Sequence, residues 1–67
     1  MKWIATFTGR MVEDIGEPYH TVIEVEGSTH REAILAIYET HEHVSFPVLV
    51  NSEGVTFTGH EGHQVSG

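Results

Sequence analysis

The stretch that decides the fold is residues 19–41, YHTVIEVEGSTHREAILAIYETH, because its hydrophobic period changes from two residues to about 3.6. Over residues 19–26, apolar or β-branched side chains alternate with polar ones, which is typical of a half-buried antiparallel strand. A glycine follows, and Thr29 with Glu32 then forms a capping box that begins a helix over residues 29–41. The apolar stripe of this helix consists of Ala33, Ile34, Ile37, Tyr38 and His41.

Strand patterns also occur on both sides of this stretch. Residues 2–8 (KWIATFT) are rich in aromatic and β-favouring side chains. Residues 44–50 (VSFPVLV) and 55–58 (VTFT) predict a hairpin. Pro47 has no N–H to donate to a neighbouring strand, so its strand lies at a sheet edge or contains a bulge. The order strand, strand, helix, strand, strand predicts an α+β two-layer sandwich, in which one helix covers one face of a small antiparallel sheet.

The length of 67 residues limits the chain to one domain, since a chain this short buries only about 60% of the surface that it exposes when unfolded. We expect this domain to occupy residues 1–58. Residues 59–67 (GHEGHQVSG) contain three glycines and little to bury, which predicts a flexible C-terminal tail. The chain has no cysteine, no long apolar run and no targeting segment, so we expect a cytoplasmic protein without disulfides or membrane contact.

The charge balance is strongly acidic. Lys2, Arg10 and Arg31 stand against ten carboxylates, which gives a formal net charge of -7. Direct binding of nucleic acid needs clustered basic residues, so this composition argues against it. The charge fits a basic protein partner, including a nucleic-acid-binding protein whose groove the carboxylates would occupy, and it also fits simple solubility.

The connection over residues 9–18 (GRMVEDIGEP) is the strongest candidate binding surface, because apolar residues there are interleaved with carboxylates. Apolar anchors inside a charged rim are a usual arrangement for protein recognition. In the alternative interpretation, Val12 or Ile15 tucks under the loop as a satellite of the core and the carboxylates are only solvated. The candidate interaction residues are Met11, Val12, Glu13, Asp14, Ile15 and Glu17.

The chain contains six histidines, and four of them form close pairs that suggest an alternative function in metal binding. The candidate ligands of zinc or another divalent transition metal are His41, His43, His60 and His63. Their spacing is not a specific zinc signature. His41 is equally explained as a residue that ends the helix, where a cation is favoured. Without such a site, we expect no cofactor.

Nothing in the sequence predicts an enzyme. No nucleophile is paired with a base, neither glycine-rich phosphate motif occurs, and a chain of this length can hardly enclose a pocket alone. Residues 2–8 carry apolar side chains on both faces of their strand, Trp3 and Phe7 on one and Ile4 on the other. Because one helix covers one face, either Ile4 is simply exposed or the open face contacts a partner or a second copy, as a homodimer or higher homo-oligomer.

Three further strings stand out: residues 5–10 (ATFTGR), a Val25-Glu26 strand before a helix, and residues 38–45 (YETHEHVS). Together they resemble small uncharacterised proteins encoded by phages of actinobacteria. The resemblance covers roughly residues 5–45. It implies no activity, cofactor or catalytic residue. It implies a phage accessory protein that acts in the host cytoplasm, commonly by binding a host or phage protein.

Together these observations predict a small, acidic, non-enzymatic protein-interaction module that binds or inhibits a host or phage protein. Two alternatives remain open. One is a histidine-rich metal-binding module. The other is a small virion component that assembles with copies of itself through its open sheet face and its proline-containing strand.

Overall fold

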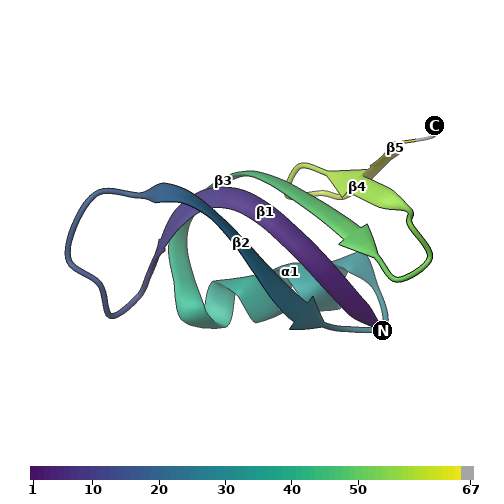
Figure 1. Cartoon of the computed structure of the whole chain (residues 1–67), viewed down its shortest axis with the longest axis horizontal. Helices are drawn as coiled ribbons and strands as arrows, with labels where there is room; N and C mark the ends of the chain where they lie inside the picture. The colour runs from purple at the N-terminus through teal and green to yellow at the C-terminus, as the bar shows by residue number, and fades with distance from the viewer. Residues whose placement is uncertain (66–67) are drawn as a thin grey trace.

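The computed structural model describes residues 1–65, which form a five-stranded antiparallel sheet and one helix (Figure 1). The elements are β1 (Lys2–Met11), β2 (Tyr19–Glu26), α1 (His30–Thr40), β3 (His41–Asn51), β4 (Thr56–Thr58) and β5 (His63–Val65). Their spatial order in the sheet is β2-β1-β3-β4-β5. The predicted α+β architecture is confirmed, and so is the hairpin that joins β3 to β4. None of the helical residues within 1–65 forms a segment long and apolar enough to cross a membrane.

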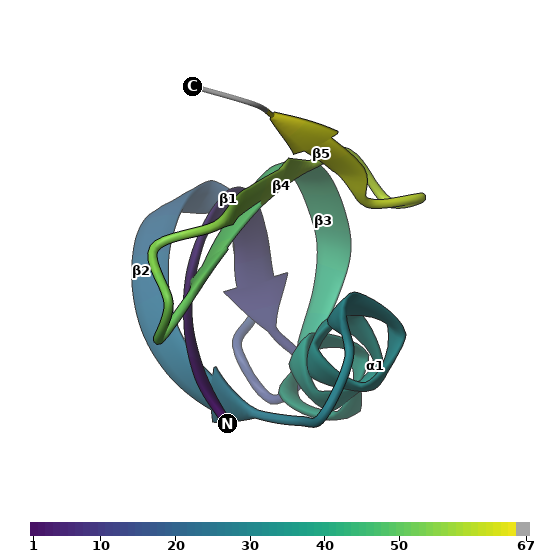
Figure 2. The ribbon, with the colours of Figure 1, turned by 90° about the vertical axis from the view of Figure 1, so that its right-hand side faces the viewer.

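The sheet curves around the helix, as Figure 2 shows in a view along the long axis of the molecule. Helix α1 packs against β2 and β3, the two strands that flank β1. It therefore covers the concave face of the sheet, and the convex face carries no second layer among the described residues.

The core lies between α1 and the concave face. Because side chains alternate along a strand, every second residue of β1 points toward the helix. The Trp3 indole N–H also donates a hydrogen bond of 2.9 Å to the Gly27 carbonyl, which fixes β1 to the segment before α1. The buried apolar side chains are Trp3, Ala5, Phe7, Ala33, Ile34, Ile37 and Leu49.

The start of α1 matches the predicted capping box. The Thr29 hydroxyl accepts a hydrogen bond from the Glu32 N–H at 3.2 Å, and the Glu32 carboxylate accepts one from the Ser28 N–H at 2.9 Å. The helix ends at Thr40. His41 has an extended backbone and is already the first residue of β3, so no loop separates the two elements.

Strand β3 contains two irregularities in its pairing with β1, one between Thr6 and Thr8 and the other between Thr8 and Arg10. A β3 residue with left-handed backbone lies at each: Phe46 has φ 54° and His43 has φ 55°. Of the two expectations for the proline, the bulge is the one observed, since β3 lies inside the sheet between β1 and β4.

The segment after β4 contains a further strand. Residues 59–67 were predicted to form a flexible tail, and within this segment β5 pairs with β4 along its whole length. Gly59 and Gly62 allow the turn that precedes β5, because both have positive φ (76° and 75°) and the Gly62 N–H donates to the Gly59 carbonyl, which reverses the chain. Residues 66–67 lie outside the described residues, and the flexibility of the tail stays a prediction.

Candidate functional site

The candidate interaction residues lie in and next to the long connection between β1 and β2, which we call the acidic loop (residues 12–18). The loop projects beyond the C-terminal end of α1 (Figure 1). Ile15 is fully exposed, and Met11 and Val12 are about half exposed. Neither Val12 nor Ile15 is a satellite of the core, so the loop presents apolar side chains to its surroundings.

Arg10 holds the acidic loop against β3. Its guanidinium donates a hydrogen bond to the Gly16 carbonyl and lies 3.4 Å from a carboxylate oxygen of Glu42. The guanidinium also lies 3.5 Å from the His43 ring. Arg10 extends from the end of β1, and Glu42 lies opposite it in the sheet. The Arg10 side chain thus connects the middle of the loop to β1 and β3.

Further hydrogen bonds order the base of the loop. The Val12 N–H donates to the Thr40 carbonyl at 2.9 Å, which joins the loop to the end of α1. The Asp14 N–H donates to the Met11 carbonyl at 3.0 Å and closes a turn, and the Tyr19 hydroxyl donates to the Asp14 carboxylate at 3.4 Å. These contacts reduce the number of conformations that a partner would have to freeze on binding.

A shallow pocket of about 220 Å³ lies between the acidic loop and the end of α1. It is lined by Met11, Val12, Glu13, Glu39 and Thr40, so it combines apolar side chains with two carboxylates. Pockets for small molecules are larger, roughly 300–1,000 Å³. The pocket therefore suits a single side chain of a partner, and a basic one best.

The carboxylates of the acidic loop are free to meet a partner. Glu13, Asp14 and Glu17 are all exposed, and within residues 1–65 none of them lies within ion-pair distance of a basic side chain. The charge of the loop is therefore not neutralised inside the molecule.

The four candidate metal ligands do not converge. His41 is buried edge-on against Phe7, with ring centroids 5.2 Å apart, whereas His43 is exposed and lies 3.2 Å from the Glu42 carboxylate. His63 lies 3.6 Å from Glu61. His60 lies in the turn before β5, where its ring stacks on Tyr38. The part of the chain that the structure describes contains no group of three or more metal-ligating side chains, and metal binding stays a prediction.

The structure reveals a histidine that sequence reasoning did not select. His30, in the first turn of α1, packs against Trp3 and Phe57, with ring centroids 6.4 Å and 5.6 Å away. Its Nε2 is buried and has no hydrogen-bond partner among residues 1–65. Burial lowers the pKa of His30. No local pattern could have indicated this site, because the contacts come from two strands distant in the sequence.

Tyr38 is the second group whose titration the fold changes. Its hydroxyl lies in hydrogen-bond contact with Nδ1 of His60, and burial raises the pKa of Tyr38. This contact attaches the turn before β5 to α1. His30 and His60 also line an open depression beside α1, together with Thr29, Arg31, Ile34, Leu35 and Glu61.

No protein-family model, curated protein or solved structure significantly matches this chain.

Proposed function

We propose that this chain is a small, acidic, non-enzymatic protein-interaction module that binds its partner through the acidic loop. The observation that carries the proposal is the complete exposure of Ile15 on a loop that Arg10 holds in place. An apolar side chain at the end of an ordered loop is a suitable anchor for a pocket on another protein.

The surroundings of Ile15 define the chemistry of the partner. Glu13, Asp14 and Glu17 lie on both sides of Ile15 in the loop and have no internal ion pairs among the described residues. A complementary surface presents an apolar pocket with lysine or arginine residues around it. Proteins that bind nucleic acid carry such basic surfaces, and the carboxylates would occupy the positions that phosphates otherwise take.

The biological setting is proposed from the resemblance to small actinobacteriophage proteins. In that setting the chain is a phage accessory protein, the partner is a host or phage protein, and binding takes place in the host cytoplasm. Charge attraction of this kind accelerates association and weakens as salt concentration rises.

The test is affinity capture from a bacterial lysate at low and at high salt, followed by mass spectrometry. The first variant changes Glu13, Asp14 and Glu17 to lysine. The matched control changes three other exposed carboxylates to lysine: Glu26, Glu53 and Glu61. The two variants have the same net charge and differ in the position of the reversed charges.

We expect one stoichiometric partner to be retained by the wild type and by the control, and to be lost at high salt or with the loop variant. Ile15→Ser tests the apolar contribution separately and should weaken binding even at low salt. Equal loss of the partner with the loop variant and with the control would refute a site in the acidic loop. Retention by both variants would refute it equally.

A further inference from the structure

The convex face of the sheet carries a surface that is uncharged at its centre. Residues that pair directly across an antiparallel sheet point to the same side, and the buried residues Trp3, Ala5 and Phe7 point toward α1. Two rows of side chains on the opposite side cross all five strands. We call these ten side chains the open face: Val22, Thr6, Val48, Thr58 and His63 in one row, and Glu24, Ile4, Val50, Thr56 and Val65 in the other.

The centre of the open face is made of β-branched side chains. Six side chains from β1, β3 and β4 occupy it: Ile4, Thr6, Val48, Val50, Thr56 and Thr58. None of the six is charged. Charge occurs only at the outer strands, where Glu24 lies 3.6 Å from Lys2, and where His63 ends the other row. The open face is therefore convex, uncharged at its centre, and flanked by groups of both signs at its β2 edge.

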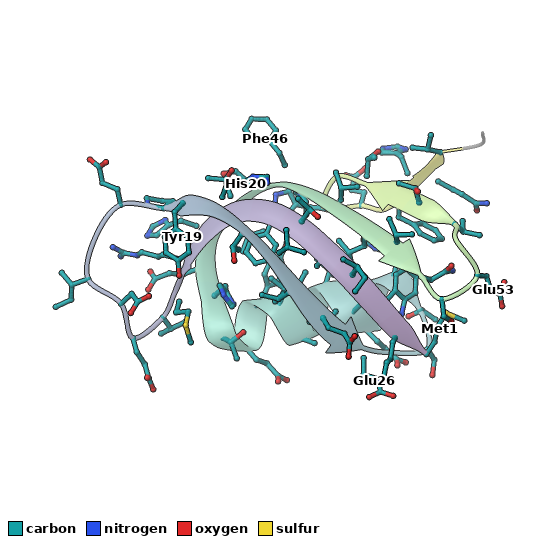
Figure 3. The ribbon with its side chains drawn as sticks, viewed as in Figure 1. Met1, Tyr19, His20, Glu26, Phe46 and Glu53 are labelled. Atoms are coloured by element: carbon teal, nitrogen blue, oxygen red, sulfur yellow. The ribbon has the colours of Figure 1, made fainter. Side chains whose placement is uncertain are left out.

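Phe46 projects from the same side of the sheet. Its side chain is 85% exposed, and Figure 3 shows it standing clear of β3 on the side away from α1. The β3 bulge holds Phe46 with φ 54°, a conformation that an aromatic residue adopts only at a cost. An exposed aromatic ring at a strained position, beside an uncovered apolar surface, is an arrangement that a contact with another molecule explains.

The distribution of charge indicates which molecule can bind to the open face. The other carboxylates lie outside the open face, most of them in the acidic loop, on α1 and in turns: Glu13, Asp14, Glu17, Glu26, Glu32, Glu39, Glu42, Glu53 and Glu61. A basic partner is attracted to those carboxylates and finds no comparable electrostatic attraction at the open face. Two copies of this chain, each with a net charge of -7, repel each other through most surfaces. At the open face they can meet with few carboxylates brought together, because those on this side of the sheet are Glu24, which lies 3.6 Å from Lys2, and Glu26 at the β2 edge.

We propose that the open face is a homodimer interface, in which two copies pack sheet on sheet about a two-fold axis. Each Phe46 ring then lies on the β-branched side chains of the other copy. Such an interface is self-complementary, because the same residues contribute from both sides. This proposal does not rest on the acidic loop, which lies at one end of the molecule (Figure 1).

The size of the open face sets the expected affinity. With five strands about 4.8 Å apart and two rows about 6.7 Å apart, the open face covers roughly 24 Å by 13 Å, and Phe46 adds to it. This corresponds to roughly 300 Å² per copy, which is below the standard size of stable interfaces and in the range of weak, transient ones. We therefore expect a reversible dimer with a dissociation constant in the micromolar range.

The test is sedimentation equilibrium of the full chain from about 1 μM to about 1 mM, a range that brackets such a constant. Ile4→Glu places a charge on the open face, and Leu35→Glu places the same charge on α1. The two residues are matched, since their side chains are 45% and 49% exposed. Phe46→Gly removes the projecting ring while favouring the left-handed backbone. Circular dichroism and Trp3 fluorescence show whether each variant is folded.

We expect dimers for the wild type and for Leu35→Glu, a monomer for Ile4→Glu, and at least a tenfold weaker dimer for Phe46→Gly. Phe46→Gly keeps the proposal testable if Ile4→Glu does not fold. A wild type that is monomeric at about 1 mM would overturn the proposal. Unchanged dimers in both open-face variants would also overturn it, and would point to pairing along the edge of β2. A closed assembly larger than a dimer would contradict the two-fold arrangement.

Discussion

Phe46 offers a sharp test of how the β3 bulge is built, because glycine and alanine should reverse their usual order of stability at this position. Both Phe46→Gly and Phe46→Ala remove the exposed ring, so the lost side-chain contacts are nearly the same. The two variants differ in how easily residue 46 adopts φ 54°. Their comparison therefore isolates the backbone contribution.

The expected difference in stability between Phe46→Gly and Phe46→Ala follows from two opposing effects. A left-handed backbone costs an L-residue roughly 1–2 kcal/mol, which glycine avoids. Glycine also stabilises the unfolded chain through its greater freedom, by about 0.4–1 kcal/mol relative to alanine. The difference leaves Phe46→Gly more stable than Phe46→Ala by about 1 kcal/mol. At Val48, two residues along β3 and without positive φ, glycine should be less stable than alanine by about 0.5–1 kcal/mol.

Thermal unfolding of the four variants, followed by Trp3 fluorescence or circular dichroism, measures both differences. For a domain of this size, about 1 kcal/mol corresponds to a shift of roughly 4–8 °C in Tm. Measurements well below the dissociation constant of the dimer keep association from contributing. If Phe46→Ala were as stable as Phe46→Gly, or more stable, the left-handed bulge at Phe46 would be refuted. If glycine were also favoured at Val48, the effect at Phe46 could not be assigned to the bulge.

Two further predictions concern the core and the partly buried His30. Leu49→Ala should lower the free energy of unfolding by about 2–5 kcal/mol, because Leu49 is fully buried. Leu35→Ala, on the exposed side of α1, should lower it by less than about 1 kcal/mol. Urea unfolding measures both losses, and equal losses would contradict the core described above. Because burial lowers the pKa of His30, the unfolded state binds the proton more readily, and stability should fall as pH decreases below about 6.5. The stability advantage of the wild type over His30→Asn should therefore shrink between about pH 8 and pH 5, and an advantage independent of pH would refute the role of burial.

The elements that local signals encode were predictable from the sequence. The strand over residues 19–26, the capping box at Thr29 and Glu32, and the β3–β4 hairpin all depend on neighbouring residues, and the structure contains each of them. The first three residues of β3 were missed because HEH has no apolar alternation and follows the helix without a loop. Strand β5 was missed because a segment of three residues, two of them polar, becomes a strand only when β4 supplies the hydrogen bonds.

The candidate site was predictable in composition and not in geometry. Interleaved apolar and acidic residues indicated the loop, but the complete exposure of Ile15 depends on the hydrogen bonds of Arg10, which no spacing reveals. For the pair His41 and His43, the spacing suggests a geometry that the structure does not have. In a regular strand their spacing would place both rings on one face, whereas here His41 is buried and His43 has a left-handed backbone and is exposed.

The position of β1 between β2 and β3 has a consequence for how the protein folds. β1 forms an uninterrupted ladder with β2 across a single loop, so this hairpin can form through local contacts. Its other neighbour is remote in the chain, since Trp3 pairs with Asn51. Closing such a long loop costs conformational entropy and is therefore slow. We expect β3 to dock late and this step to limit the folding rate. Until then the second edge of β1 is unpaired, and pairing with another unfolded chain at that edge competes with folding.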